Sequence, residues 1–328
     1  MIQDLNARPL RNVRVSVTDR CNLRCAYCMP EPDYVWLPRE DVLQFEEIEA
    51  LIDVFLAEGV DKVRLTGGEP LLRRDLPVLV ERLAKRPAIR DLAMTTNGVL
   101  LADHARSLRD AGLHRLTVSL DTLRHDRFRD LARFDELDRV KDGIATAAAV
   151  FGELKIDTVV IRGVNDDELI ELIAFGREHH AEVRFIEYMD VGATNGWRMD
   201  DVVPAAEIVR MISAEMPLAP ADPNYNGEVA QRWRYLDGGG EIGVIASVTQ
   251  AFCRDCTRAR LSTEGKLHTC LFAAQGHDLR DLLRGGFTDE QLGNAVAAVW
   301  RRRGDRYSEL RTAATTRAPK VEMSYIGG

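Results

Sequence analysis

Cysteine is scarce in this chain of 328 residues and is absent from most of its length. The six cysteines form two groups of three: Cys21, Cys25 and Cys28, then Cys253, Cys256 and Cys270. In a reducing cytosol, cysteines clustered in this way more often bind metal or carry out redox chemistry than form structural disulfides. The pattern therefore indicates metal or redox sites rather than a disulfide framework.

The chain also lacks a long hydrophobic run and an excess of basic residues. No apolar stretch approaches the ~20 residues of a membrane-spanning helix. Charged side chains interrupt residues 1–20, so we expect no signal-peptide core there. The net charge of −8 argues against an extended nucleic-acid surface, although a few local arginines would suffice for a small anionic substrate. We expect a cytoplasmic protein that binds neither membranes nor nucleic acids.

Short β-rich runs alternate with amphipathic stretches over the first 190 residues. Strands are predicted at 13–17, 62–66, 91–96, 114–120, 155–161 and 183–189. Helices are predicted near 46–58, 76–85, 102–111, 136–151 and 166–180. This alternation predicts an α/β fold in which a parallel sheet with right-handed crossovers curves into a partial (β/α)6 barrel.

The pattern changes after residue 190. Helices are predicted near 204–215, 278–284 and 288–302, and strands around 230–236 and 241–248. We interpret residues 1–190 as the barrel and residues 191–328 as a C-terminal α+β cap that closes over the barrel mouth and carries the second cysteine group.

Chemically suggestive residues follow the carboxyl ends of four predicted strands. The first cysteine group follows strand one, and Gly67-Gly68-Glu69-Pro70 follows strand two. Asn97-Gly98 follows strand three, and Ser119 and Asp121 come at the end of strand four. Barrels of this class place their active sites at this face. We therefore expect the active site there.

The first cysteine group has C-x3-C-x2-C spacing on a predicted loop. Thiolates are soft ligands that suit iron–sulfur clusters, zinc or copper. Three ligands leave one iron of a [4Fe–4S] cluster without a protein ligand, whereas most electron-transfer ferredoxins use four cysteines. The alternative is a structural zinc site that borrows a distant histidine, such as His104 or His114.

The second group has C-x2-C-x13-C spacing. A zinc ribbon is one interpretation, but it requires four ligands, and only His268 lies close enough in sequence to be the fourth. The other interpretation is a second cluster whose open iron faces the barrel mouth and holds the substrate.

Five cations form the candidate anion site. Arg258 and Arg260 come directly after Cys256, and guanidinium groups match phosphate oxygens in a bidentate way. Arg14 and Arg64 lie inside otherwise apolar predicted strands, where an unpaired charge is costly. Lys155 lies on strand five. For each of these residues alone, the alternative is a solvated surface charge.

The first cysteine loop, with Tyr27 before its last cysteine, and the Gly67–Pro70 turn together resemble the radical S-adenosylmethionine superfamily. The resemblance implies that the amino and carboxylate groups of S-adenosylmethionine chelate the open iron. It also implies that one electron from the cluster cleaves the sulfonium and yields a 5′-deoxyadenosyl radical. This chemistry belongs to the cofactor, while the protein supplies orientation and a dry cavity.

From about Leu10 to Gly328 the chain resembles the GTP 3′,8-cyclases of molybdenum cofactor biosynthesis. The matching motifs are RxSxTDxCNxRCxYC (14–28), KVRLTGGEP (62–70), TTNG (95–98), VSLDT (118–122), RFIEYM (184–189), FCxxCxRxR (252–260), GKLHTCLF (265–272) and the terminal SYIGG. The chain departs from the family at Asp157, where Asn is common, and at Thr257-Arg258-Ala259-Arg260, where Asn-Arg-Leu-Arg is frequent. Both departures are expected to affect substrate affinity rather than ligation.

The resemblance implies a role for each motif residue. The six cysteines would hold two [4Fe–4S] clusters. S-adenosylmethionine would contact Tyr27, Gly68, Glu69, Ser119 and Met189. GTP would contact Arg14, Arg64, Thr95, Lys155, Arg258, Ala259 and Arg260. The catalytic residues would be Arg14, Arg258, Arg260, and Gly327 and Gly328 of a tail that inserts towards the active site.

The resemblance also implies the reaction and its partners. The radical would abstract hydrogen from C3′ of GTP, and C3′ would bond to C8 to give 3′,8-cyclo-7,8-dihydro-GTP, the first step of molybdopterin synthesis. An external one-electron reductant and a downstream enzyme that acts on the cyclic product would be partners, and a homodimer is compatible with the sequence.

Two rival hypotheses remain at this point. A radical S-adenosylmethionine enzyme that modifies peptides would usually carry more cap cysteines and would leave Arg258 and Arg260 without a role. A zinc-stabilised RNA-binding or scaffold protein conflicts with the acidic net charge and with the lack of basic–aromatic stripes.

Overall fold

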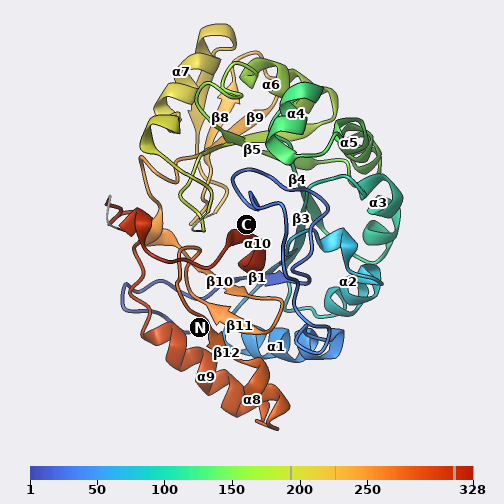
Figure 1. The fold of residues 1–328 in the computed structure, drawn as a ribbon, viewed down its shortest axis with the longest axis vertical. Coiled ribbons are helices and arrows are strands. Elements are labelled where there is room, and N and C mark those ends of the chain that lie inside the picture. The colour runs from blue at the N-terminus through green and yellow to red at the C-terminus, as the bar shows by residue number, and fades with distance from the viewer. Residues whose placement is uncertain (193, 226, 313–314, 328) are drawn as a thin grey trace.

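The computed structural model describes residues 1–192, 194–225, 227–312 and 315–327. Within these ranges one curved sheet of twelve strands runs through the molecule, with most helices on its outer side (Figure 1). The strand order is β12-β11-β10-β1-β2-β3-β4-β5-β6-β9-β8-β7.

The first half of the chain supplies six parallel strands. They are β1 (Asn12–Ser16), β2 (Lys62–Thr66), β3 (Asp91–Thr96), β4 (Arg115–Ser119), β5 (Leu154–Val160) and β6 (Ala181–Glu187). The helical elements between them are α1 (Phe45–Ala57), η1 (Pro70–Leu72), α2 (Leu76–Ala84), α3 (Leu101–Asp110), α4 (His125–Ala132), α5 (Leu137–Phe151) and α6 (Leu169–Glu178). All six predicted strands and five predicted helices are confirmed.

Helix α4 is the element that the periodicity did not reveal. Its eight residues bury only Phe128, Leu131 and Ala132, so two turns offer too short a pattern to recognise. Helix α1 shows the opposite case. It begins with a capping box between Gln44 and Glu47, buries one continuous face and ends before Gly59, whose φ is +105°.

The second half of the chain extends the sheet at both edges. Its elements are η2 (Met199–Asp201), α7 (Ala205–Glu215), β7 (Leu218–Ala221), β8 (Gln231–Tyr235), β9 (Glu241–Ile245), η3 (Cys253–Asp255), β10 (Arg258–Leu261), β11 (Lys266–His268), β12 (His277–Asp278), α8 (Arg280–Arg284), α9 (Asp289–Arg301), η4 (Thr315–Arg317) and α10 (Met323–Ile326). Strand β9 is parallel to β6, and β10 is parallel to β1. Eight parallel strands are thus flanked at each end by antiparallel ones.

This topology corrects the expected position of the C-terminal segment. We expected a cap over the barrel mouth, but strands β9 and β10 continue the barrel wall on both sides. The boundary at residue 190 stays a prediction, because one sheet runs through both parts.

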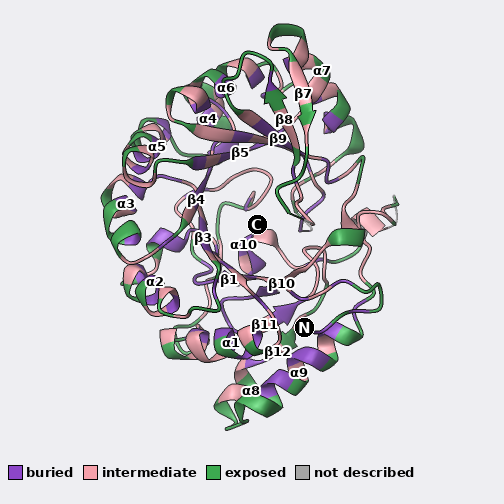
Figure 2. Ribbon diagram, turned by 180° about the vertical axis from the view of Figure 1, so that it is seen from behind, coloured by how far each residue is buried: buried purple, intermediate pink, exposed green. Residues whose placement is uncertain are grey.

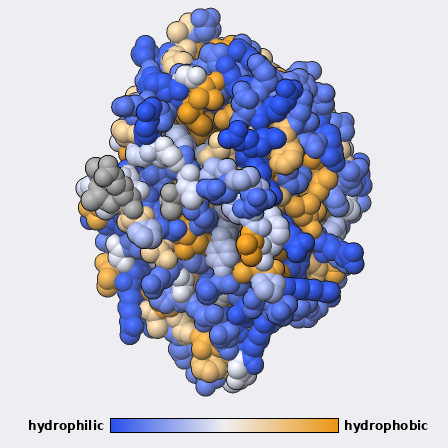
Figure 3. Space-filling model, viewed as in Figure 1, coloured by the Kyte–Doolittle hydropathy of each residue, from blue (hydrophilic) through white to orange (hydrophobic). Residues whose placement is uncertain are grey.

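The core lies between the sheet and its outer helices. In Figure 2 the strands are largely buried, and the helices are buried on their inner sides and exposed on their outer sides. The face seen in Figure 3 is mostly hydrophilic, with hydrophobic residues in scattered patches. None of the helices in the described ranges is long and apolar enough to cross a membrane.

Candidate active site

A cavity of about 730 Å³ lies inside the curve of the sheet. All six cysteines line it. Its size falls in the range of sites for small-molecule ligands. Six of the seven predicted GTP contacts also line it from strands: Arg14, Arg64, Thr95, Lys155, Arg258 and Arg260.

The first cysteine group follows the carboxyl end of β1, as predicted. The backbone N–H of Leu23 and the side-chain amide of Asn97 donate to Sγ of Cys21, over 3.5 and 3.8 Å. Burial raises the pKa of the Cys21 thiol to about 11, and burial and the neighbouring thiols raise the pKa of Cys25 well above its usual value. Half-buried thiols, with two donors to the Cys21 sulfur, fit an iron–sulfur cluster, because its positive irons favour the thiolate form.

Asp121 ties this cysteine loop to the barrel wall. Its carboxylate accepts hydrogen bonds from the Tyr27 hydroxyl at 2.6 Å and from the backbone N–H of Val159 at 2.8 Å. Burial raises the pKa of Asp121 to about 6. The Tyr27 side chain is therefore engaged with the protein, which leaves its backbone for contacts with a cofactor.

The Gly67–Pro70 turn packs against the segment that leads into the cysteine loop. The amide of Gly68 donates to the Thr18 carbonyl at 2.9 Å, and that of Glu69 donates to the Arg20 carbonyl at 2.7 Å. A Cβ atom on Gly68 would collide with the Arg20 carbonyl, so only glycine fits there.

Glu69 lines the cavity, but its carboxylate is occupied. It accepts hydrogen bonds from the amide of Leu71, the hydroxyl of Thr96 and the amide of Asn97, over 2.7–3.0 Å. Burial raises its pKa to about 7. The Glu69 side chain thus connects the carboxyl ends of β2 and β3 through hydrogen bonds. Of the other predicted cofactor contacts, Ser119 and Met189 line the cavity at this same edge.

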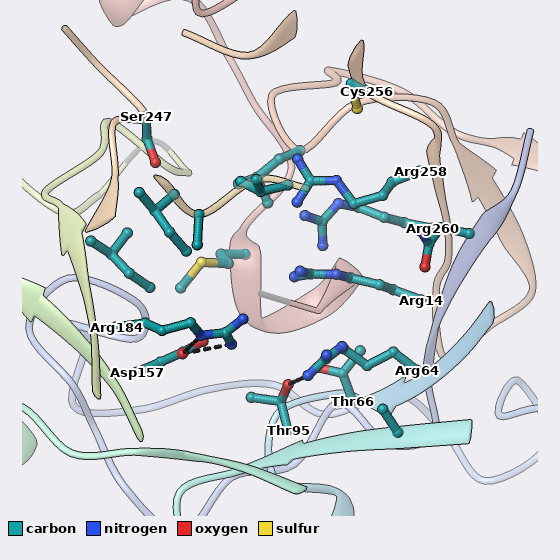
Figure 4. Close-up of a pocket in the computed structure, with 18 of the residues that line it drawn as sticks. Arg14, Arg64, Thr66, Thr95, Asp157, Arg184, Ser247, Cys256, Arg258 and Arg260 are labelled. Carbon is teal, nitrogen blue, oxygen red and sulfur yellow. Dashed lines mark hydrogen bonds and ion pairs between the residues drawn. The ribbon is translucent and has the colours of Figure 1, made fainter. Parts of the chain in front are cut away.

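Three arginines lie side by side in the middle of the cavity wall. Arg14 on β1 is in register with Arg64 on β2 and with Arg260 on β10. The side chains of Arg14, Arg258 and Arg260 extend side by side from the same wall into the cavity (Figure 4). Burial and mutual repulsion lower the pKa of Arg14 well below its usual value, and that of Arg260 to about 9.

Carboxylates do not balance these charges among the described residues. Arg14 makes no hydrogen bond or ion pair there, and Arg258 only stacks over Phe252 at 5.1 Å. Arg64 donates to two neutral hydroxyls, those of Thr95 at 2.8 Å and Thr117 at 3.0 Å. Because buried charges without partners are costly, the arrangement requires an anionic ligand. The interpretation as a solvated surface charge is thereby excluded for the buried Arg260 and disfavoured for Arg14 and Arg64, which are half-buried.

Asp157, the departure from the family pattern, does not face the arginines unpaired. Arg184 on β6 forms an ion pair with it at 2.7 Å, as Figure 4 shows. Arg184 was not predicted as a site residue, although it shares with Arg14 the signal of a charge inside an apolar strand. Lys155 is paired with Glu182 and is thus a less available cation.

Ala259 is not brought to the cavity. Its side chain is fully buried in the core on the opposite face of β10 from Arg258 and Arg260. A contact between the Ala259 side chain and substrate therefore has no support in this arrangement.

The second cysteine group lies at the other end of the barrel from the first. Cys253 and Cys256 precede β10, which runs parallel to β1, so they lie at the amino ends of the strands. Cys270 follows the antiparallel β11 and returns to the same edge. We expected this group in a cap that faces the barrel mouth; the parallel pairing of β10 places it at the amino ends of the strands, where it lines the same cavity.

The thiols of this group differ in their surroundings. Burial raises the pKa of Cys256, but Arg258 and Arg303 outweigh it and lower the value to about 6. Burial raises the pKa of Cys270 to about 11. A cationic donor at Cys256 and the partial burial of all three thiols fit a cluster at this end as well.

His268, the suggested fourth zinc ligand, does not line the cavity with the cysteines. Burial lowers its pKa to about 4. Within the described ranges no three His, Cys, Asp or Glu side chains converge as one metal ion would require. A cubane places each thiolate on a separate iron, so its ligands need not converge on one point.

Helix α10, near the end of the described chain, lies at the centre of the barrel in Figure 1. The carbonyl of Gly327 accepts a hydrogen bond from Arg260. Gly327 has a φ of +73°, and a Cβ atom there would collide with the Thr66 side chain. Gly328 lies outside the described residues.

Asp190, directly after Met189, holds the segment that leads to this end. Its buried carboxylate pairs with Lys320 at 3.0 Å and Arg311 at 2.9 Å, and it accepts a hydrogen bond from the Tyr307 hydroxyl. The tail is thereby fixed to the loop after β6.

Two protein-family models match the chain. The model "Radical SAM superfamily" matches residues 15–176, and "Molybdenum Cofactor Synthesis C" matches residues 181–309. A relative from Acidothermus cellulolyticus, named GTP 3′,8-cyclase, is 54% identical over 100% of this chain and 99% of its own. The chain belongs to the GTP 3′,8-cyclase family.

More distant relatives agree. Proteins named GTP 3′,8-cyclase from Xanthomonas campestris pv. campestris (strain B100) and Staphylococcus aureus (strain MRSA252) are 50% and 44% identical. Each alignment covers 100% of this chain, with 97% and 99% of the relative. Family membership confirms the resemblance found in the sequence and rejects the scaffold and peptide-modifying alternatives.

Solved structures support the fold. The structure of Streptococcus suis SuiB bound to S-adenosylmethionine matches with a TM-score of 0.60 at 16% identity, over 95% of this chain and 72% of that one. SuiB bound to its precursor peptide SuiA gives 0.61 at 16% identity, over 90% and 65%. At this identity the likeness concerns the fold alone. The radical S-adenosylmethionine superfamily implies a [4Fe–4S] cluster and S-adenosylmethionine as cofactors.

Proposed function

We propose that this protein converts GTP to 3′,8-cyclo-7,8-dihydro-GTP, the first step of molybdopterin synthesis, in a cavity between two [4Fe–4S] clusters. One observation carries the proposal. Arg14, Arg64 and Arg260 stand in register on adjacent strands without a carboxylate partner in the described ranges, between cysteine groups at opposite ends of one cavity.

The first cluster belongs on Cys21, Cys25 and Cys28, and S-adenosylmethionine belongs on its open iron. There the bound cluster supplies the electron that cleaves the cofactor. The Tyr27 backbone, Gly68, Ser119 and Met189 surround the same edge of the cavity and form the cofactor pocket. Glu69 keeps this pocket in shape through the ends of β2 and β3.

The triphosphate of GTP belongs on the arginines. Arg14, Arg64, Arg258 and Arg260 each offer donors to phosphate oxygens, and a bound polyanion removes the repulsion that lowers the pKa of Arg14. Thr95 already accepts a hydrogen bond from Arg64 and thereby orients its guanidinium group. Lys155 contributes less, because Glu182 holds it.

Cys253, Cys256 and Cys270 would hold the second cluster, and its open iron would bind the guanine. With the triphosphate on the arginines, the ribose of GTP would lie between the two ends of the cavity. Hydrogen abstraction from C3′ is followed by bond formation between C3′ and C8, and one electron and one proton then complete the product. An external one-electron reductant supplies the electrons.

The Gly327 carbonyl on Arg260 brings the tail to this site, and we propose that Gly327 and Gly328 act there together with Arg14, Arg258 and Arg260. The free thiols of all six cysteines suit a reducing cytoplasm. A downstream enzyme that takes the cyclic product, and a homodimeric assembly, belong to the same proposal.

The test is an anaerobic incubation of the reduced protein with S-adenosylmethionine and GTP. We expect about eight irons per chain with matching sulfide, and formation of both 5′-deoxyadenosine and the cyclic nucleotide. Omission of GTP is the control. Cofactor cleavage that GTP does not stimulate, with no cyclic product, would contradict the proposal, as would zinc in place of iron.

A further inference from the structure

Two buried arginines, Arg8 and Arg303, contact the second cysteine group. Arg303 follows α9, and Arg8 lies in the segment before β1. The Arg303 side chain is 1% exposed and that of Arg8 is 2% exposed. None of the site roles described above involves them.

Both arginines contact the cysteine loop directly. Arg303 donates through Nη1 to the Cys256 carbonyl at 2.7 Å and through Nη2 to the Cys256 Sγ at 3.2 Å. Arg8 donates through Nη1 to the Cys253 carbonyl at 2.6 Å. The Arg303 guanidinium group thus donates to both the carbonyl and the sulfur of Cys256. The Arg8 guanidinium group holds Cys253, the first residue of the loop.

Asp4 locks the two guanidinium groups in place. Its fully buried carboxylate accepts from Arg8 Nε at 2.6 Å and from Arg303 Nη1 at 3.2 Å. Trp300 lies under the Arg303 guanidinium at 4.5 Å and donates from its indole to the Arg8 carbonyl at 3.1 Å. Arg303 therefore has little freedom to turn away from Cys256.

The fully buried part of this cluster carries a net positive charge when the sulfur is not counted. Two buried cations share one buried carboxylate, and Asp305, 3.5 Å from Arg303 Nε, is the other acidic side chain paired with Arg303. Asp305 is partly exposed and also accepts a hydrogen bond from the Thr269 hydroxyl at 2.6 Å. A permanently anionic Cys256 sulfur, as in a metal-bound thiolate, completes the set.

We infer that Arg303 is a positioning residue for Cys256 that also raises the reduction potential of the second cluster. A cation that donates to a ligating thiolate stabilises the reduced, more negative state of a cluster more than the oxidised state. The inference rests on the second cluster of the proposed function. Asp4 and Arg8 keep the Arg303 side chain in contact with Cys256.

The experiment compares Arg303→Met with Arg302→Met, a neighbouring residue whose side chain is exposed. Iron and sulfide are counted in anaerobically reconstituted protein, and each cluster is titrated by EPR-monitored reduction. We expect R303M to lower the reduced-to-oxidised ratio of the second cluster at least tenfold at a fixed potential, which is about 59 mV for one electron. The first cluster, at the other end of the barrel, is expected to titrate as in the wild type.

Each result either supports or contradicts the role of Arg303. Eight irons in R303M with the second-cluster potential of R302M would overturn the inference. Loss of four irons from R303M but not from R302M supports the holding role. Should R303M fail to fold, Arg303→Lys retains the buried charge but loses the forked geometry, and we expect a smaller shift in the same direction; no shift there would also overturn the inference. Four irons in the wild type would remove the second cluster from the proposed function itself.

Discussion

Arg14 is a half-buried cation without an acidic partner in the part of the chain that the structure describes. Such a group increases the affinity for an anionic ligand. It also lowers the free energy of unfolding of the protein when no ligand is bound. A hydrogen bond to a charged group contributes roughly 1.5–3 kcal/mol, and about 1.4 kcal/mol is a tenfold change in affinity.

Arg14→Met is therefore expected to raise the Kd for GTP at least tenfold, while the free energy of unfolding without GTP stays equal or increases. Anaerobic calorimetry and denaturant unfolding measure the two quantities. Arg11→Met is the control, because Arg11 is half-exposed and paired with Asp61 at 2.6 Å. If R14M binds GTP as tightly as R11M, the arginine row is not the phosphate site.

The Glu69 carboxyl makes a pH-dependent contribution to the free energy of unfolding. Its pKa is about 7 in the folded protein because of burial, and about 4.3 in an unfolded chain. The folded state then binds the proton more tightly, so this stabilisation is complete below about pH 4 and is lost as the pH rises through about 7.

We expect the metal-free wild type to lose of the order of 3 kcal/mol relative to Glu69→Gln between pH 4 and 8. Denaturant unfolding at several pH values measures the difference. Glu153→Gln, at an exposed position, serves as the control. Parallel pH curves for the wild type and E69Q would show that the Glu69 carboxyl is not perturbed.

At the scale of elements, α10 and the residue after it fill the centre of the barrel. Gly327 combines a left-handed backbone with a position against Thr66, so a side chain there meets both strain and collision. Gly163 offers a matched comparison, because its φ is +70° and a Cβ atom there would meet open space.

Gly327→Ala is expected to lower the rate of cyclic product formation at least tenfold, whereas Gly163→Ala leaves it nearly unchanged. Thr66→Ser removes the methyl group that Cβ would strike, so the double variant T66S/G327A is expected to regain part of the rate. Product formation by chromatography measures all three. Equal rates for G327A and the wild type would exclude a tail that must fit closely.

The regular elements could be predicted from the sequence because their signals are local. The spacing of Ile48, Leu51, Ile52 and Phe55 predicts α1, and the apolar strands predict β1 to β6. Charges inside such strands also identified Arg14 and Arg64 as unusual. The Arg184–Asp157 pair was missed, because it depends on the register of two strands that local patterns do not set.

At the scale of the whole molecule, the two cysteine groups lie at opposite ends of one cavity. Sequence spacing could indicate two clusters but not their positions, because the pairing of β10 with β1 joins residues far apart in the chain. Similarly, the roles of Arg8 and Arg303 depend on the N-terminal segment, α9 and the Cys253–Cys256 loop coming together.

Because the two cysteine groups are separate, we expect each site to lose its iron without affecting the other site. Replacing Cys21, Cys25 and Cys28 with alanine should leave about four irons and abolish formation of 5′-deoxyadenosine. Alanine at Cys253, Cys256 and Cys270 should also leave about four irons, but should retain basal 5′-deoxyadenosine formation without cyclic product. Iron analysis and chromatography test both variants, each serving as the control for the other. Loss of all iron from either variant would show that the two sites depend on each other.

The pairing of Asn12 with Arg258 has a consequence for synthesis of the chain. When the ribosome has released β1 to β6, the sheet has two open edges, at β1 and β6, and such edges can pair with other chains. Both are covered only after β9 and β10 emerge, and the barrel interior is filled only by the final residues. Folding is thus delayed to the end of translation, in the manner of high-contact-order proteins, and nascent chains depend on protection from aggregation until then.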